Sequence, residues 1–211
     1  ADMGVKRIEF IDDIFNVKKK DFVEFFRRSA RDKLNVSFYF PTALKGDLLD
    51  KETIDAMMEG GAVGVNVSLE SASPRMQKVM RKNLNIERFR ESLEYLCSKY
   101  PEAVTTLNTM HGFPTETEEE AMMTLDFILS MKWVHFPYTH IVRIFPGTDL
   151  EKFALEHGVG KSAIATGIII ELNFFIFKVW SERYLARAIV VKTFANSLVW
   201  IPNGRPIFNH L

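Results

Sequence analysis

Apolar and polar residues along the first 145 positions follow two different periods. Short runs of apolar or β-branched residues, some alternating strictly with polar ones, predict β-strands. Five such runs lie at residues 6–12, 35–40, 62–70, 103–110 and 138–145. Between them, apolar residues recur every three or four positions, as they do on one face of an amphipathic helix. The chain therefore predicts five strands separated by helices.

Three apolar stripes define the clearest of these helices. In chain order they are Phe22, Phe25, Phe26 and Ser29, then Ile86, Phe89, Leu93, Leu96 and Tyr100, then Ala121, Leu125, Ile128 and Leu129. Each stripe occupies one side of a helix, so each helix is expected to pack that side against the sheet.

Residues typical of helix starts agree with this interpretation. Asp50 is a predicted N-cap, and Ser73 followed by Pro74 matches an N-cap and the first helical position. Thr117 with Glu120 three residues later matches a capping box. Successive strand centres lie about 30–40 residues apart, which is the length of a βαβ unit. We therefore expect a parallel α/β sheet.

The third predicted strand indicates what kind of sheet this is. Its apolar residues point one way, whereas Asn66, Ser68 and Glu70 point the other. A central strand with helices on both faces would be apolar on both sides. Thr106 and Asn108 continue the polar face on the next strand. A closed eight-stranded barrel needs about 250 residues, so we predict a parallel partial (β/α) barrel whose polar inner face encloses a ligand.

The character of the chain changes after about residue 160. Residues 164–180 are strongly apolar, but the run is shorter than the about 20 residues of a membrane span. It also contains Glu171 and Asn173, which are costly in lipid. We therefore predict a barrel domain at 1–158 and a mainly helical C-terminal extension at 159–211, without a membrane span.

Composition narrows the function classes. The 211 residues suggest about one domain, and 27 basic against 27 acidic side chains argue against a broad electrostatic nucleic-acid binder. Cys97 is the single cysteine, which excludes an intrachain disulfide, a thiolate zinc site and an iron–sulfur cluster held by several cysteines of this chain. The low cysteine count and the lack of a signal peptide at the start favour a reducing, cytoplasmic compartment.

Candidate chemistry follows the strands, because ligands of parallel α/β folds bind at the carboxyl ends. Asp12 and Asp13 end the first predicted strand, and Glu70 ends the third. A carboxylate closing an inward polar face is costly unless it is paired or ligand-bound, so we interpret Glu70 as functional. His111 alone is more typical of a hydrogen-bonded structural histidine. Together with residues 143–148, the carboxylates and His111 are predicted to form a functional rim at the carboxyl ends of the strands.

Four motifs in this order carry a family resemblance: FIDDIF, GVNVSLESASPRMQKVMRKN, GFPTETEEEAMMTLDFI and RIFPGTDLEKFALEHG. Across residues 5–158 the chain resembles the radical S-adenosylmethionine (radical SAM) superfamily, and most closely the group that often carries an upstream cobalamin-binding domain. The resemblance implies a six-strand partial barrel and a CxxxCxxC loop that binds a [4Fe–4S] cluster. It also implies reductive cleavage of SAM to methionine and a 5′-deoxyadenosyl radical that abstracts a substrate hydrogen.

The resemblance also implies which residues hold SAM. Asp12 and Asp13 match the element near its amino group. Ser68 and Glu70 match the element that contacts its ribose or methionine part. The positions expected to flank or hold adenine are Gly112, Phe113, Pro114, Ile144, Phe145 and Pro146.

One part of the family pattern is absent, because the chain has no CxxxCxxC motif. It presents five strands that begin at the family's second, and Cys97 is expected on a helix away from the rim. We therefore expect the SAM-binding portion of an enzyme whose cluster loop lies upstream, inactive alone. A [4Fe–4S] cluster and cobalamin are expected in the parent protein only. The first strand would then have an unpaired edge, which invites self-association.

Two alternatives stay open at this stage. Asp12, Glu70 and His111 are oxygen and nitrogen donors that suit a divalent-metal-dependent lyase or hydrolase. A non-catalytic scaffold derived from the same fold is the other alternative. The substrate is not indicated, because fold does not fix function.

Overall fold

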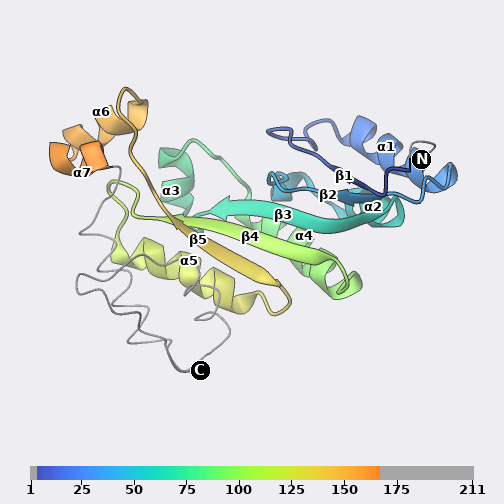
Figure 1. Ribbon diagram of the computed structural model, residues 1–211. Coiled ribbons are helices and arrows are strands. Elements are labelled where there is room, and N and C mark those ends of the chain that lie inside the picture. The colour runs from blue at the N-terminus through green and yellow to red at the C-terminus, as the bar shows by residue number, and fades with distance from the viewer. Residues whose placement is uncertain (1–3, 167–211) are drawn as a thin grey trace, which may run out of the picture.

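The computed structural model describes residues 4–166, and its centre is a single parallel β-sheet (Figure 1). The spatial order of the strands is their order in the chain, and every neighbouring pair is parallel. The strands are β1 (Arg7–Glu9), β2 (Ser37–Tyr39), β3 (Ala62–Glu70), β4 (Val104–His111) and β5 (Phe136–Ile141). The predicted five-stranded parallel α/β sheet is confirmed.

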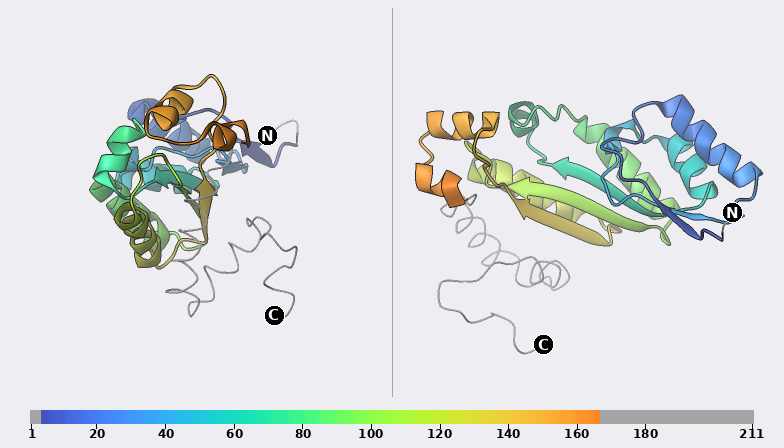
Figure 2. Two further views of the ribbon diagram at one scale, coloured as in Figure 1. Left: turned by 90° about the vertical axis from the view of Figure 1, so that its left-hand side faces the viewer. Right: turned by 45° about the horizontal axis from the view of Figure 1, so that its top comes forward.

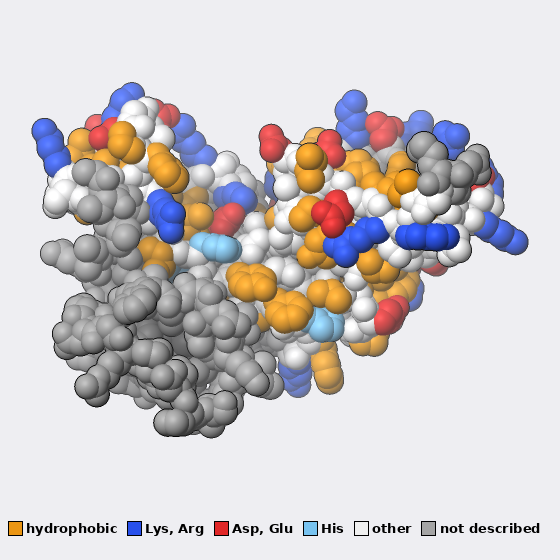
Figure 3. Space-filling model, in the orientation of Figure 1, with side chains coloured by type: hydrophobic (Ala, Val, Ile, Leu, Met, Phe, Trp, Pro, Cys, Tyr) orange, Lys and Arg blue, Asp and Glu red, His pale blue; other side chains and the backbone are white. Residues whose placement is uncertain are grey.

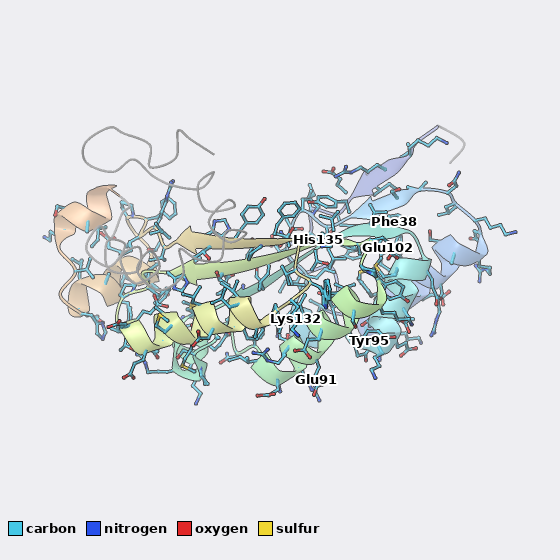
Figure 4. The ribbon with its side chains drawn as sticks, turned by 90° about the horizontal axis from the view of Figure 1, so that it is seen from below. Phe38, Glu91, Tyr95, Glu102, Lys132 and His135 are labelled. Carbon is cyan, nitrogen blue, oxygen red and sulfur yellow. The ribbon has the colours of Figure 1, made fainter. Side chains whose placement is uncertain are left out.

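Helical segments connect each strand to the next. They are α1 (Lys19–Arg31), the 3-10 helix η1 (Gly46–Leu48), α2 (Lys51–Glu59), α3 (Pro74–Val79), α4 (Ile86–Lys99) and α5 (Glu118–Ser130), followed after the last strand by α6 (Asp149–Glu156) and α7 (Lys161–Thr166). Figure 2 shows α3 and α5 on the same side of the strands in the end-on view, and Figure 4 shows α4 and α5 along one face. The remainder of the predicted C-terminal extension lies outside the described residues.

The predicted helix starts are confirmed by their hydrogen bonds. Asp50 caps α2 and exchanges capping-box bonds with Thr53. The Ser73 side chain accepts the Met76 amide with Pro74 at the first helical position. Thr117 caps α5 in a capping box with Glu120. Local sequence therefore fixes where these helices begin.

The first strand is shorter than the predicted 6–12, because β1 ends at Glu9. The Phe10 amide still donates to the Tyr39 carbonyl at 3.0 Å. In a parallel ladder the next donor would be residue 41, but this is Pro41, which has no N–H. Instead of a backbone amide, the Thr42 hydroxyl donates to the Phe10 carbonyl oxygen at 2.9 Å. The proline therefore ends the pairing.

The last strand is displaced towards the N-terminus of its predicted range, 138–145, because β5 begins at Phe136 and ends at Ile141. The Val142 amide still donates to the His111 carbonyl at 2.9 Å. Beyond this bond, Gly112 adopts a φ of 81°, which turns β4 away from its neighbour. The following segment therefore leaves the sheet.

The hydrophobic core lies between the sheet and α1, α2, α4 and α5. The helix-facing residues of β3 are Val65, Val67 and Leu69, each at most 2% exposed. At the β1–β2 end the core is a cluster of phenylalanine rings: Phe10, Phe15, Phe22, Phe25, Phe26, Phe38 and Phe40. Fully burying such a ring contributes about 1.5–3 kcal/mol, and Phe25, which is 37% exposed, contributes less than the others. The predicted apolar stripes therefore drive the helices onto one face.

A cluster of charged and polar side chains around Glu120, called the clasp below, joins the start of α3 to the start of α5. Arg75 contacts both carboxylate oxygens of Glu120, with Nε–Oε1 at 2.8 Å and Nη2–Oε2 at 2.5 Å. Ser73 Oγ donates to Glu120 Oε1 at 2.7 Å, and the Thr117 amide donates to Oε2 at 3.0 Å. The Arg75 hydrogen bonds lower the pKa of Glu120 from 4.5 to about 2. The clasp thus holds a buried carboxylate in its charged form.

The turn between β4 and α5 is held by the same arginine. Arg75 Nη2 donates to the Thr115 carbonyl at 2.6 Å, and the Gly112 amide donates to Glu116 Oε2 at 2.8 Å. Thr115 has a φ of 72°, a conformation in which a β-branched residue is strained. Such strain costs about 1–3 kcal/mol and persists only where surrounding contacts impose it.

Glu120→Gln keeps the shape of the clasp carboxylate but removes its charge. We expect the free energy of unfolding near neutral pH to fall by about 2 kcal/mol, because hydrogen bonds to charged groups contribute about 1.5–3 kcal/mol. Denaturant unfolding measures this change. Glu118→Gln is the matched control, because Glu118 is exposed in the first turn of the same helix. It should change stability by less than about 0.5 kcal/mol.

The same pair predicts a pH dependence. A carboxyl group whose pKa is lower in the folded than in the unfolded state stabilises the fold above its unfolded pKa. This contribution is lost as the pH falls towards the folded pKa, so for Glu120 the window runs from 4.5 down to about 2. Between these limits the unfolding free energy of Glu120→Gln should fall less steeply than that of the parent chain. Parallel curves would contradict the assignment.

Thr115→Gly should raise the free energy of unfolding by about 1 kcal/mol, because glycine adopts a positive φ without strain. Thermal unfolding measures the effect. Thr115→Val is the control: it keeps the β-branch and removes only the hydroxyl, which accepts a 3.3 Å bond from Arg75. We expect Thr115→Val to be neutral or destabilising. Equal stabilisation by both variants would show that backbone strain is not the cause.

Candidate functional site

The face of the sheet opposite the helices and the core is called the open face below. It carries a row of polar side chains that bond to one another across the strands. Asn66 Nδ2 donates to the Pro41 carbonyl at 2.9 Å, and Asn108 Nδ2 donates to Asn66 Oδ1 at 2.8 Å. His140 Nε2 lies 3.4 Å from Asn108 Oδ1. The row runs from the β2 loop to β5, and it confirms the predicted polar inner face at Asn66 and Asn108.

Beside this row the open face is hollowed to a volume of about 330 Å³. It is lined by polar and ring side chains and one valine: Asn66, Thr106, Asn108, His140, Tyr39, Phe136, Tyr138 and Val104. The rings of Phe136, Tyr138 and His140 follow one another along β5, and His135 precedes them just before the strand begins. In Figure 3, hydrophobic side chains lie between two histidines on this face. The hollow has the size of a small-molecule site.

Tyr39 closes the hollow on the β2 side. Its ring lies directly over Gly64, where a Cβ atom would come within 1.9 Å of the ring. The Arg7 guanidinium lies 4.6 Å from the ring centroid and also bonds Glu9 at 2.8 Å. Gly64 is therefore the residue that lets the Tyr39 ring lie flat against β3.

The predicted carboxylates occupy different settings on the rim. Asp12 and Asp13 lie in the loop after β1 and are exposed. The Asp12 carbonyl oxygen lies 2.9 Å from the Thr42 hydroxyl, which anchors the loop to the β2 end. Glu70 ends β3 with a φ of 63° at a shift in register, and its carboxylate bonds Lys82 Nζ at 2.9 Å. Glu70 is thus paired with a lysine of this chain, and its interpretation as a functional residue stays a prediction.

Ser68 lies on the same open face as Asn66, in register with Asn108. Glu70 follows, opposite Thr109. The predicted contacts to the ribose or methionine part of SAM therefore adjoin the polar row directly. Their role in SAM binding stays a prediction.

The predicted adenine-holding residues lie in two segments at the carboxyl end of the sheet. Gly112 and Pro114 are buried in the turn after β4, and Phe113 is half-buried. Ile144 is fully buried in a small apolar cluster with residues of α6 and α7, whereas Phe145 is 62% exposed and Pro146 is exposed. Of the later segment, Phe145 presents the larger apolar surface on this rim.

His111 lies on the helix side of the sheet and not on the predicted rim. Because side chains alternate along β4 and Asn108 faces the open side, His111 faces the helices and is 2% exposed. Its Nδ1 atom lies 3.6 Å from Glu116 Oε1, beyond a hydrogen bond. Within the described residues neither ring nitrogen has a hydrogen-bond partner, so the expected hydrogen-bonded histidine is wrong.

Sequence analysis missed His140, Tyr39 and Thr42. A signal for His140 was present, because Phe136, Tyr138 and His140 alternate along β5 with residues that face the helices. The predicted range 138–145 began two residues after the observed start of β5 and left out Phe136, so the alternation was not recognised. Tyr39 and Thr42 carried no local signal, because their roles depend on Gly64 and on the β1 loop.

The metal hypothesis is not supported by the described part of the chain. It contains no group of three or more His, Cys, Asp or Glu side chains that could hold a metal ion, so Asp12, Glu70 and His111 do not converge. Cys97 is buried on α4, where burial raises the pKa of its thiol. One thiol on the helix side does not fit a [4Fe–4S] cluster. Among residues 4–166 no helix is long and apolar enough to cross a membrane.

Comparison with known proteins identifies relatives of this fold. An uncharacterised methyltransferase of Pyrococcus horikoshii is 28% identical over 157 residues, which cover 74% of this chain and 33% of the relative. A tRNA-2-methylthio-N(6)-dimethylallyladenosine synthase of Clavibacter michiganensis subsp. michiganensis is 35% identical over 100 residues, which cover 46% of this chain and 19% of the synthase. The chain thus spans a third or less of each relative.

Two solved structures of TsrM, a radical SAM methyltransferase from Kitasatospora setae, share the fold. The one with cobalamin and a [4Fe-4S] cluster bound aligns with a TM-score of 0.61 and 18% identity over 74% of this chain and 31% of TsrM. The one with tryptophan substrate and the SAM analogue aza-SAM aligns with a TM-score of 0.57 and 16% identity, over 64% of this chain and 27% of TsrM.

The family itself is established by sequence. The Radical SAM superfamily model matches residues 1–128, which is more than half of the chain. The structural similarity to TsrM agrees with this assignment at the level of the fold. This chain belongs to the radical SAM superfamily.

Proposed function

We propose that this chain is the SAM-binding part of a radical SAM enzyme. The match of residues 1–128 to the superfamily carries the proposal, and the polar open face supports it. In the parent enzyme a [4Fe–4S] cluster, held by cysteines outside this chain, would cleave SAM reductively so that a 5′-deoxyadenosyl radical abstracts a substrate hydrogen. Cobalamin in the parent protein is part of the same proposal.

The residues of this chain suit the parts of SAM that they would bind. The exposed carboxylates of Asp12 and Asp13 complement the ammonium group of its methionine part. Ser68 offers a hydroxyl and Glu70 a carboxylate on the open face, where they can bond ribose hydroxyls. Phe113 and Phe145 offer apolar surface for the adenine ring. Lys82 holds the Glu70 carboxylate in place at 2.9 Å.

A non-catalytic scaffold is the second candidate. It is favoured by one observation: the chain's single thiol, Cys97, is buried on the helix side. The genomic sequence upstream of this chain separates the two candidates. A CxxxCxxC motif within one βα unit supports the enzyme, and a natural start near Ala1 supports the scaffold.

We expect this chain to bind SAM and Glu70→Gln to weaken the binding about tenfold, because a hydrogen bond to a charged group is worth about 1.5–3 kcal/mol. Isothermal titration measures both affinities. Glu87→Gln, exposed in the first turn of α4, is the matched control and should bind like the parent chain. Equal affinities for Glu70→Gln and the control would remove Glu70 from the site.

The parent protein provides the test of the reaction. If it carries the cysteine motif, the anaerobically purified protein with a low-potential reductant should contain iron and release 5′-deoxyadenosine from SAM. A protein without iron, and without deoxyadenosine, would overturn the proposed function.

The edge strand β1 supports a further proposal, that this chain alone self-associates. β1 pairs only with β2 within the described residues, and Ile8 and Ile11 beside its free edge are 38% and 77% exposed. Size-exclusion chromatography should show a species larger than the monomer, and Ile8→Lys should shift it to the monomer. If the unsubstituted 211-residue chain elutes only as a monomer, this proposal is contradicted.

A further inference from the structure

We propose that the hollow on the open face binds a neutral, planar nitrogen heterocycle, with its edge on Asn66 and Asn108 and its faces against the rings of β5. This inference rests on the proposed function, for which the heterocycle would be the substrate class. It goes beyond that function because neither SAM cleavage nor the family fixes what the sheet holds.

The amide row provides donors for such an edge. Each amide nitrogen has two N–H groups. Asn66 uses one on the Pro41 carbonyl and Asn108 uses one on Asn66, at 2.9 and 2.8 Å. Within the described residues, no hydrogen bond uses the second N–H of either amide, so these donors and the second lone pair of Asn108 Oδ1 are open to a ligand. Because the row fixes which atom of each amide donates, it presents a preset pattern of donors and acceptors.

The ring side chains provide the stacking surface. Phe136 and Tyr138 are nearly parallel, with an interplanar angle of 14° and centroids 6.3 Å apart, and they are 43% and 37% exposed. Tyr138 pairs in register with Asn108 across the strands. A flat ligand that bonds the Asn108 amide therefore lies against an exposed aromatic face. Stacking of a base on an aromatic side chain is worth about 1–3 kcal/mol.

The charge of the hollow selects for a neutral ligand. No Lys, Arg, Asp or Glu is among the side chains that line it in the described part of the chain. The Arg7 guanidinium, which lies over the Tyr39 ring, bonds Glu9 and is not among the lining side chains. A phosphate or carboxylate group would lose its hydration without gaining a partner here.

The position of the hollow connects it to SAM chemistry. Asn108 lies between Ser68 and Tyr138 in the strand register, and Glu70 follows on β3. A ligand held by Asn108 is therefore a neighbour of the residues proposed to bind SAM. This proximity is what a hydrogen-abstracting enzyme requires of its substrate.

The experiment uses the full chain and a probe that is not a part of SAM. Cytosine is neutral and planar and carries an amino donor beside ring acceptors, whereas orotate adds a carboxylate to a similar ring. In nitrogen-labelled NMR spectra, cytosine should shift the side-chain amide signals of Asn66 and Asn108, and orotate should not. Asn108→Leu, of similar shape, should weaken cytosine binding about tenfold, as the loss of one hydrogen bond predicts.

Tyr138→Ala keeps the test decisive if Asn108→Leu fails to fold, because Tyr138 is exposed on an edge strand. It should weaken cytosine binding about tenfold through lost stacking. Cytosine that leaves the Asn signals unmoved, equal binding of orotate, or unchanged affinity in the variants would overturn the proposal. SAM binding without cytosine binding overturns this inference alone, and cytosine binding without SAM binding overturns the proposed function instead.

Discussion

Among the described residues, helices cover one face of the parallel sheet, and the polar side chains of the other face bond to one another. Here Asn66 and Asn108 bond to each other at 2.8 Å, and Asn66 continues to the Pro41 carbonyl. The row reaches His140 at the far edge. Because each amide is held by its neighbour, the open face has a fixed pattern of donors and acceptors and can recognise a ligand without a large rearrangement.

The carboxyl end of the sheet is stabilised differently. There Arg75, in the first turn of α3, contacts the β4–α5 turn at Thr115 and the start of α5 at Glu120. The same contacts hold Thr115 at a φ of 72°, so hydrogen bonds to a charged pair offset backbone strain in the turn. Glu70, also at positive φ, is held by Lys82. The rim residues are therefore positioned by ion pairs and the open face by neutral amides.

This division agrees with two adjoining sites in a radical SAM protein. Charged and apolar rim residues suit the ammonium, ribose and adenine parts of SAM, and the neutral hollow suits an uncharged ring beside them. The chain spans about a third of the related methyltransferase, and its single thiol lies on the helix side. Cluster chemistry is therefore a property proposed for the parent protein and not for this chain.

Much of the fold could be predicted from local patterns. Alternation along 62–70 determined which face of β3 meets the helices, and Asp50, Ser73 and Thr117 determined helix starts, because these signals act over a few residues. The four motifs also indicated the radical SAM superfamily, which the family match over residues 1–128 bears out. Strand ends were less accurate: Pro41 ended β1 from the neighbouring strand, so the cause lay about 30 residues away in the chain.

Only the tertiary structure decided the composition of the site. Arg75 and Glu120 are 45 residues apart, and their pairing depends on how α3 and α5 are placed. Asn66 and Asn108 are 42 residues apart, and their pairing depends on the register between β3 and β4. The same register turned His111 away from the rim and brought His140 to the amide row. The sequence by itself determined the strands, the polar face and the family, because these follow from short-range periodicity and motifs. Which side chains meet was decided by parallel pairing, which joins residues that no local signal connects.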